Sequence, residues 1–190
     1  DPVLSRGLGD VYKRQIESSI KLVKKGKENA QGTICYTTSP VHNERYWIKL
    51  AKDIEDIGAT SLAIKDMAGL LRPRTCYELV KKLKKNLNIP IHLHTHSTTG
   101  LSDATNFKAY EAGIDNIDTS ISSFSNLYAH TATESFISMM YSEEKNPFDM
   151  ELLTKISVYF NEVRKKYKKY EGSMRGVDVN MLTNQVPGGM

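Results

Sequence analysis

Cysteine is scarce in this chain, which contains only Cys35 and Cys76 among its 190 residues. Two cysteines cannot build the disulfide framework of a small secreted domain, so their number favours a reducing compartment. No run of about eighteen apolar residues occurs, which argues against a transmembrane helix. The first residues also lack the apolar segment of a secretory signal peptide. Together these absences predict a cytoplasmic protein.

A strong excess of either charge is also missing, since 26 Lys and Arg residues stand against 22 Asp and Glu residues, for a formal net charge of +4. The lysines are scattered along predicted helices, as at 81–85 and 164–166, where a solvated helix face is the usual explanation. We therefore expect no nucleic-acid partner. The 39% of hydrophobic residues supply a sizeable core, and the length fits one domain, or one domain with an appendage.

Residues 1–15 have the least regular pattern of the chain. They lack sustained helical or strand periodicity and resemble the read-through of a sequencing adapter. We expect this segment to be a non-native leader and exclude it from the fold prediction.

From residue 16 onward, helical and strand patterns alternate. Predicted strands begin near residues 32, 61, 91 and 116, a spacing that matches the length of one βα unit. Four consecutive units make half of a TIM (β/α)8 barrel. A doubly wound sheet is the alternative, but no glycine-rich phosphate loop follows any strand. The predicted strands span 32–37, 61–66, 91–97 and 116–122, and the predicted helices span 16–27, 43–57, 75–87, 102–112, 132–141 and 150–170.

Three histidines alternate along the predicted strand 91–97. Alternation places His92, His94 and His96 on one face of the strand. Imidazoles two residues apart can converge on one metal ion. His94 and His96 lie nearest the carboxyl end, where α/β barrels carry their functional groups, so these two are the candidate ligands, whereas His92 is expected to pack in the barrel. The alternative is that the histidines line the barrel without a metal and hydrogen-bond to their neighbours.

Lys65 stands at the end of an otherwise apolar strand, where its ammonium group would point into the mouth of a barrel. Burying an unpaired charge is costly, and the adjacent Asp66 faces the other side of the strand. Reaction of the amine with CO₂ would replace the positive charge with a carbamate, which binds metals. The alternative is a lysine that extends to the rim and pairs with a carboxylate.

Five segments occur in this order along the chain: 32–37 (GTICYT), 64–71 (IKDMAGLL), 92–100 (HLHTHSTTG), 111–115 (EAGID) and 185–189 (QVPGG). Together they resemble the biotin-dependent carboxyltransferase family. This family includes the oxaloacetate decarboxylase α subunit and the carboxyltransferase domain, or separate carboxyltransferase subunit, of pyruvate carboxylase. The resemblance covers nearly all of residues 16–190. It implies that 16–145 form the C-terminal half of a carboxyltransferase TIM barrel and that 146–190 begin a truncated, helical C-terminal carboxylase domain.

The resemblance also implies an activity, which is metal-dependent carboxyl transfer between carboxybiotin and pyruvate or oxaloacetate. Lys65, as a carbamate, would ligate a divalent Zn, Mn or Co ion together with His94 and His96. Biotin would arrive on a separate biotinyl carrier domain. The implied partners are a biotin carboxylase or membrane decarboxylase subunits, a small keto-acid and further copies of the full-length protein. The location would then be the cytoplasm or the periphery of a membrane decarboxylase complex.

The chain departs from the family pattern at several places, two of which concern the metal site and the active mouth. The first-strand aspartate that completes the family's metal site is absent, so we expect the chain alone to be inactive. Residues 125–131 replace a Gly-Thr-Ser-Gln-Pro-like stretch at the active mouth, which leaves the acceptor open. His130 lies in this loop and could act at the mouth, but the alternative is that it is exposed to solvent, as a lone loop histidine usually is. An acyl-CoA Claisen-type metallolyase or synthase on the same barrel is the alternative enzyme.

Overall fold

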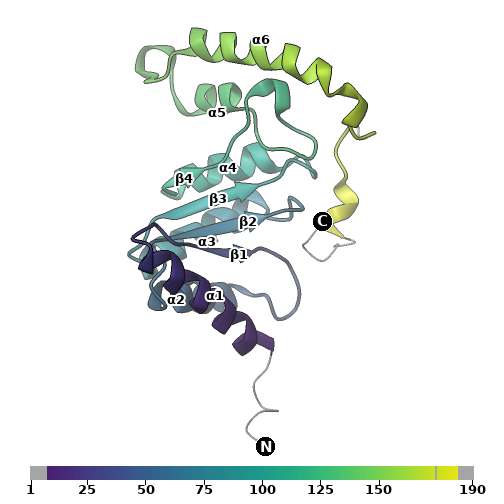
Figure 1. Cartoon of the computed structure of the whole chain (residues 1–190). Coiled ribbons are helices and arrows are strands. Elements are labelled where there is room, and N and C mark those ends of the chain that lie inside the picture. Colours follow the sequence, from purple (N-terminus) through teal and green to yellow (C-terminus); the bar gives the residue numbers. More distant parts are fainter. Residues whose placement is uncertain (1–7, 174, 184–190) are drawn as a thin grey trace, which may run out of the picture.

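The computed structural model describes residues 8–173 and 175–183, and Figure 1 shows a parallel sheet with helices around it. The sheet has the order β1-β2-β3-β4, so neighbouring strands are also consecutive in the chain. A doubly wound sheet would reverse its order at a switch point. The uninterrupted order is that of a barrel segment. The strands are β1 (Gln31–Cys35), β2 (Ser61–Asp66), β3 (Ile91–Thr95) and β4 (Asn116–Ile117).

Among the described residues, six α-helices follow the predicted alternation, with short 3-10 turns in the second half of the chain. The first helix begins at Leu8 and not at residue 16. The prediction that residues before 16 lack helical structure was therefore wrong from Leu8 onward. The helices are α1 (Leu8–Lys25), α2 (Glu44–Asp56), α3 (Pro73–Asn86), α4 (Ser102–Glu111), α5 (Thr133–Met140) and α6 (Met150–Lys166). The 3-10 turns are η1 (Ser122–Phe124), η2 (Glu143–Lys145), η3 (Lys168–Tyr170) and η4 (Val179–Leu182).

Local sequence signals explain where α2 begins and ends. The Asn43 side chain accepts a hydrogen bond from the backbone amide of Tyr46, which satisfies one of the free amides of the first turn. Gly58 follows the helix with φ +99°, a left-handed conformation in which glycine ends helices at low cost. The chain can therefore turn directly from α2 toward β2.

One face of the sheet, here called the helix-covered face, carries the core. Ile34, Leu62, Ile64, Ile91 and Leu93 point to this side and are 0% exposed. They join one hydrophobic cluster with the buried side chains of α2 and α3. Full burial of one such aliphatic side chain contributes about 1.5–3 kcal/mol. The helices hold the sheet rigidly from this side.

The opposite face, here called the polar face, carries Gln31, Ser61, Lys65, His92 and His94, which alternate with the core residues along the same strands. Parallel pairing sets Lys65 directly beside His94. The carboxyl ends of β2 and β3 thus bring the two sequence motifs to the same edge of the sheet.

Strand β4 is shorter than the predicted strand 116–122. Its ladder ends with the bond from the Asp118 amide to the Leu93 carbonyl, at 3.0 Å. Beyond it the Ser120 amide bonds to the Thr131 carbonyl at 3.0 Å, so the chain pairs with the segment before α5 and no longer with β3. This change of partner opens the loop that precedes α5.

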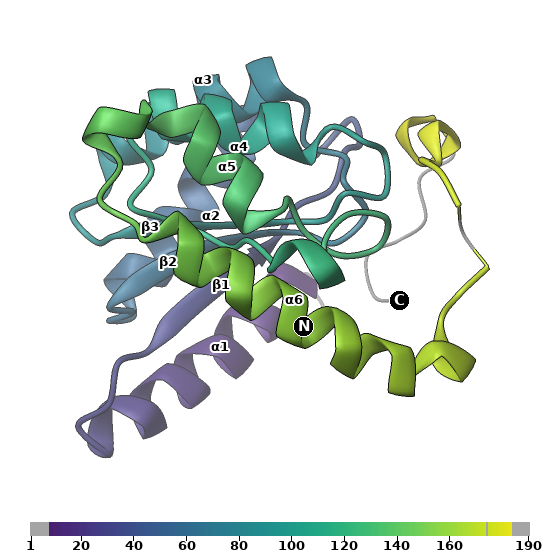
Figure 2. The same ribbon diagram turned by 90° about the horizontal axis from the view of Figure 1, so that it is seen from above.

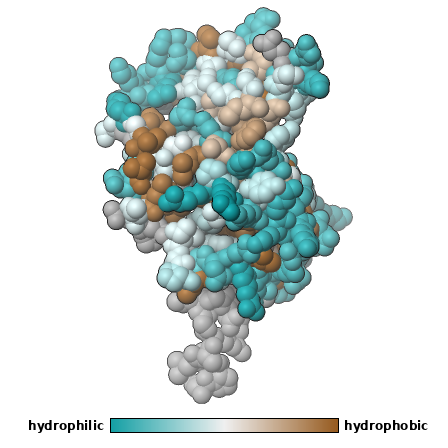
Figure 3. Space-filling view, turned by 180° about the vertical axis from the view of Figure 1, so that it is seen from behind, coloured by the Kyte–Doolittle hydropathy of each residue, from teal (hydrophilic) through white to brown (hydrophobic). Residues whose placement is uncertain are grey.

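The helices surround the sheet unevenly. Helices α1 and α2 lie at the β1 end, whereas α5 and α6 follow the β4 end (Figure 1). Seen from above, α3, α4 and α5 group on one side of the strands (Figure 2). The surface behind the sheet is hydrophilic over most of its area (Figure 3). No helix of the described residues is long and apolar enough to cross a membrane. Residues 185–189, one of the family-like segments, lie outside the described part.

Candidate metal centre

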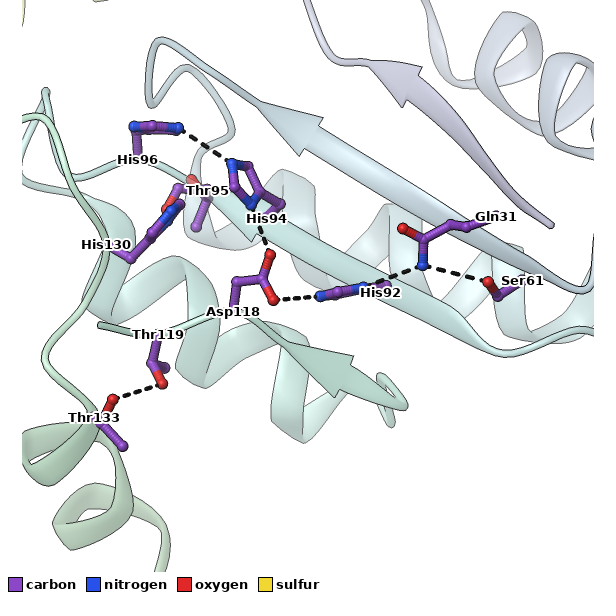
Figure 4. Close-up of polar contacts among 10 residues, drawn as sticks. All are labelled: Gln31, Ser61, His92, His94, Thr95, His96, Asp118, Thr119, His130 and Thr133. Carbon is purple, nitrogen blue, oxygen red and sulfur yellow. Dashed lines mark hydrogen bonds and ion pairs between the residues drawn. The ribbon is translucent and has the colours of Figure 1, made fainter. Parts of the chain in front are cut away.

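Three imidazoles meet at the carboxyl end of β3. One ring nitrogen of each of His94, His96 and His130 lies within 4.8 Å of the other two. The first two residues come from the end of β3, and the third comes from the loop between η1 and α5 (Figure 4). The ring centroids of His94 and His130 are 4.4 Å apart, and those of His96 and His130 are 4.6 Å apart.

The loop at residues 125–131 delivers His130 to this place. Asn126 and Leu127 adopt left-handed backbone angles, with φ of 64° and 53°. This conformation is uncommon for a bulky side chain. The Asn126 amide bonds to the His130 carbonyl at 2.7 Å, which closes the loop on itself, and the Ser97 amide bonds to the Ala129 carbonyl at 2.8 Å. The loop is thereby attached to the end of β3.

The base of the same loop is anchored in the core. Thr131 is 0% exposed, and its hydroxyl accepts a hydrogen bond at 2.9 Å from the amide of Asn106, which is also 0% exposed. The Thr131 hydroxyl donates in turn to Ser102 at 3.2 Å. Both partners belong to α4, so the helix fixes the backbone next to His130.

Each of the three rings is held by an acceptor at its Nδ1 atom. His94 Nδ1 contacts the Asp118 carboxylate at 2.6 Å, His130 Nδ1 contacts the Thr95 carbonyl at 2.8 Å, and His96 Nδ1 contacts the carbonyl of Tyr128. Carbonyls and carboxylates can only accept hydrogen bonds, so each Nδ1 carries the proton. In the neutral rings the Nε2 lone pairs are therefore free, as in histidines that bind metals.

His92 has the opposite arrangement. Its Nε2 contacts Asp118 at 2.7 Å and therefore carries the proton, while its Nδ1 accepts from Gln31 at 3.2 Å. Gln31 also donates to Ser61 at 3.3 Å. With both nitrogens engaged, His92 lies outside the three-histidine cluster and supports it through Asp118 (Figure 4).

Asp118 holds two histidines with its two oxygens. Partial burial opposes its ionisation, but the hydrogen bonds from His94 and His92 outweigh this effect and keep the pKa of the carboxyl below its usual value. An ionised carboxylate behind a histidine fixes the tautomer and makes the other ring nitrogen a better ligand.

Lys65 shares the polar face with these histidines. It is half-buried beside His94 and forms no ion pair with any carboxylate in the described part of the chain. Burial lowers the pKa of His96 against the hydrogen bond to Tyr128, and the charges of His130, His94 and Lys65 lower it further. The alternative considered for Lys65, a rim pairing with a carboxylate, is not found among the described residues.

Asp66 points to the helix-covered face, opposite Lys65. It is 0% exposed and accepts hydrogen bonds from the amides of Leu70 and Leu71 at 2.8 and 2.9 Å and from the Thr95 hydroxyl at 3.0 Å. Burial raises its pKa, while these bonds oppose the rise. Asp66 shapes the loop after β2 and does not reach the cluster.

The same loop approaches the end of β3 closely at Gly69. Its φ is +67°, and its carbonyl accepts a hydrogen bond from the Thr99 hydroxyl at 2.6 Å. A Cβ atom at this position would lie 2.8 Å from the His96 carbonyl. The loops after β2 and β3 are thus in direct backbone contact.

The donor set fits a divalent transition ion. Two nitrogens bound to one tetrahedral ion at about 2.0–2.1 Å lie roughly 3.3–3.4 Å apart, and the Nε2 atoms of His94 and His96 are 3.2 Å apart. Neutral imidazoles suit zinc and its neighbours among the metals. An ion bound there would act as a Lewis acid toward a carbonyl oxygen.

The structure brings together the predicted site residues Lys65, His94 and His96 at one edge of the sheet. The sequence left open a role for His130 at the mouth but favoured an exposed loop residue, and it did not single out Asp118. The parallel register offers a signal for Asp118, because Leu93 pairs with Ile117 and the next residues, His94 and Asp118, become neighbours.

Comparisons with known proteins give a consistent set of matches. A family model described as HMGL-like matches residues 9–160. A pyruvate carboxylase subunit of Methanocaldococcus jannaschii is 44% identical over 185 residues, which cover 96% of this chain and 32% of that protein. The methylmalonyl-CoA carboxyltransferase 5S subunit of Propionibacterium freudenreichii subsp. shermanii is 43% identical over 180 residues, which cover 93% of this chain and 35% of that protein.

The same similarity appears among solved structures. The carboxyl transferase domain of Rhizobium etli pyruvate carboxylase with pyruvate superposes with a TM-score of 0.86 at 30% identity, covering 90% of this chain and 30% of that chain. The chain therefore spans about a third of the length of these relatives, as the 32%, 35% and 30% coverages show.

Proposed function

The chain belongs to the HMGL-like family, and we propose that it is the metal-bearing half of a carboxyltransferase barrel, which moves a carboxyl group between carboxybiotin and pyruvate or oxaloacetate. Its similarity to a pyruvate carboxylase subunit and to a carboxyltransferase subunit supports this activity. The observation that carries the proposal is the position of Lys65 beside His94 and near His96 at the carboxyl edge of the sheet.

Lys65 is the residue that separates this proposal from related chemistry. Its neutral amine would attack CO₂, forming an N–C bond and releasing one N–H proton, which leaves a carbamate anion on the side chain. No ion pair to a carboxylate in the described part of the chain competes with this reaction. The carbamate, His94 and His96 would then hold the divalent Zn, Mn or Co ion.

A bound divalent ion would polarise the keto oxygen of the acceptor and so stabilise charge on its enolate form. The chain's own residues would prepare that site. Asp118 fixes the ring of His94, and the carbonyl of Tyr128 fixes the ring of His96. Gln31, His92 and Ser61 extend the hydrogen-bonded surface along the polar face, where a small keto-acid would lie.

The remaining parts of the proposal concern what surrounds the site. Residues 16–145 would be the barrel half, 146–190 the beginning of the following carboxylase domain, and 1–15 a non-native leader. Biotin would come from a carrier domain that visits the open mouth, in partnership with a biotin carboxylase or with membrane decarboxylase subunits. Further copies of the full-length protein would complete the assembly, in the cytoplasm or beside a membrane complex.

A chimaera tests this proposal without knowledge of the flanking sequence. Residues 16–183 would replace the matching segment of the M. jannaschii pyruvate carboxylase subunit, and decarboxylation of oxaloacetate would be followed with free biotin present. We expect metal-dependent turnover that Lys65→Ala abolishes and Lys81→Ala, an exposed lysine of α3, leaves unchanged. Full activity and full metal content in the Lys65→Ala chimaera would refute the proposal.

The chain as it stands offers a second check. We expect the 190-residue protein alone to be inactive toward oxaloacetate, because no described residue replaces the missing aspartate ligand on the family's first strand. Turnover by the isolated chain would contradict this expectation. Cleavage of an acyl-CoA without biotin would favour the Claisen-type reaction, in which Lys65 has no expected role.

A further inference from the structure

We propose that His130 is a third imidazole ligand, so that this chain captures a divalent transition ion through His94, His96 and His130 without the carbamate of Lys65. The inference rests on the proposed metal site but goes beyond it. Among the residues of this chain, the proposed carboxyl transfer needs only Lys65, His94 and His96 as ligands, and it would stand if His130 proved not to be a ligand.

The rings of His94 and His96 are in contact through their Nε2 atoms. With both Nδ1 protons directed to acceptors, the Nε2 atoms of His94 and His96 face each other at 3.2 Å as lone pairs. Two lone pairs at that distance repel each other, and the contact becomes favourable only with a cation between them. A metal ion or a shared proton meets that need, and the two differ in their response to added zinc.

His130 is oriented as a ligand and not as a surface residue. It is half-buried, its Nδ1 donates to the Thr95 carbonyl at 2.8 Å, and its ring lies against both other imidazoles. One of its ring nitrogens lies within 4.8 Å of a ring nitrogen of each of His94 and His96, and the three side chains lie together in Figure 4. Three histidines with one open position are a common arrangement for a zinc ion.

Hydrogen bonds fasten the loop at residues 125–131 to the end of β3. The carbonyl of Tyr128 holds His96, the Thr95 carbonyl holds His130, and the Ser97 amide bonds to the Ala129 carbonyl at 2.8 Å. All three links join residues 125–131 to the end of β3. Metal binding would therefore tighten the loop and the strand as one unit, at the entrance to the site.

Lys65 stands apart from this unit. It belongs to β2, and no hydrogen bond joins it to the three histidines in the described part of the chain. A protonated Lys65 would repel the ion, whereas a carbamate would add a fourth ligand. We therefore expect binding without CO₂ and tighter binding with it.

The experiment is a titration of the metal-free 190-residue chain with Co²⁺ and Zn²⁺ in CO₂-free buffer, followed by visible absorption and calorimetry. His130→Ala should weaken binding by more than about 100-fold, beyond the 10–100-fold typical of a lost outer partner. His42→Ala is the matched control, since His42 contacts Ser39 and Trp47 away from the cluster. Lys65→Met should bind at least as tightly as the unaltered chain.

The outcomes are distinct. Equal binding by the His130→Ala variant and the unaltered chain overturns the inference, as does the absence of binding by the unaltered, folded chain. Loss of binding in Lys65→Met alone also overturns it, while supporting the carboxyltransferase site. Circular dichroism checks folding, and His130→Asn provides a second variant should the alanine variant unfold.

A direct spectrum tests the ligand atom without any substitution. Long-range ¹H–¹⁵N correlation of the histidine rings distinguishes a free Nε2 lone pair, a protonated nitrogen and a metal-bound nitrogen. We expect Zn²⁺ to shift the Nε2 resonances of three rings and to leave those of His42 and His92 in place. A shared proton with no zinc-dependent shift at His130 would contradict the proposal.

Discussion

The two faces of the sheet are built from the same strands, yet they use their side chains in opposite ways. On the helix-covered face, Ile64 and Leu93 are 0% exposed and packed on every side. On the polar face, Lys65 and His94 lie next to each other with coordinating or reactive atoms still unused. The side chains of the first face are fully buried in packing, whereas the histidines at the edge of the second could hold a ligand.

Two adjacent residues show the contrast most clearly. Asp66, on the helix-covered face, accepts three hydrogen bonds from Leu70, Leu71 and Thr95. Lys65, one residue earlier, forms no ion pair in the described part of the chain. Ionisable groups thus occur on both faces. Asp66, whose oxygens all have partners, has a structural role, whereas Lys65 is available for chemistry.

The largest effect should come from the helix-covered face. Leu93→Ala should lower the free energy of unfolding by about 2–5 kcal/mol, because it leaves a cavity among fully buried side chains. Leu22→Ala is the control, since Leu22 is 69% exposed. Urea denaturation measures both. A loss for Leu93→Ala no larger than that for His94→Ala would remove the distinction between the faces.

The next effect tests the saturated carboxylate of the core. Asp66→Asn should cost about 1–3 kcal/mol of stability. The NH₂ group that replaces one carboxylate oxygen cannot accept the hydrogen bonds which that oxygen accepts. Metal affinity should stay within about twofold, since Asp66 lies on the face opposite the histidines. Asp103→Asn, at an exposed position of α4, provides the comparison. Denaturation and metal titration on the same samples decide the result.

The matching change on the polar face should show the reverse pattern. Asp118→Asn should weaken metal binding by about 10–100-fold, because the ring of His94 loses its anionic partner. Its effect on unfolding should be smaller than that of Asp66→Asn. Asp56→Asn, at the exposed end of α2, is the matched control. Unchanged affinity would show that Asp118 does not support the ligands.

The smallest effect lies at the other end of the strands. Slight burial opposes ionisation of Asp115, but hydrogen bonds from Lys84 and the Ile91 amide hold its pKa below its usual value. The resulting stabilisation is present above the pKa of the unfolded state and is lost as the pH falls through the lower folded value. Lys84→Met should therefore reduce the loss of unfolding free energy at low pH by less than about 1 kcal/mol. An unchanged profile would contradict this.

Sequence reasoning predicted the parts of the molecule that local patterns determine. The parallel units, the caps of α2 at Asn43 and Gly58, and the side-by-side motifs of Lys65 and His94 follow from periodicity, cap chemistry and alternation. The family resemblance was also confirmed by the HMGL-like match over residues 9–160. The roles of Lys65, His94 and His96 as ligands stay predictions.

The features that were missed depend on contacts between distant segments. His130 reaches the cluster because Asn126 and Leu127 adopt left-handed angles, and a turn of this kind has no glycine to announce it. Asp118 becomes a partner of His94 only through the register of β3 with β4. Strand β4 ends early because Ser120 pairs with the segment before α5. None of these contacts has a periodic signature in the sequence.

Gly69 shows how narrow the tolerance of this site is. Its missing side chain lets the loop after β2 pass so near to β3 that an added methyl group would meet the His96 carbonyl at 2.8 Å. The distance between the loop after β2 and the backbone at the end of β3 therefore leaves no room for a side chain at this position. Replacement of Gly69 by alanine would therefore displace His96, a candidate ligand at the end of β3.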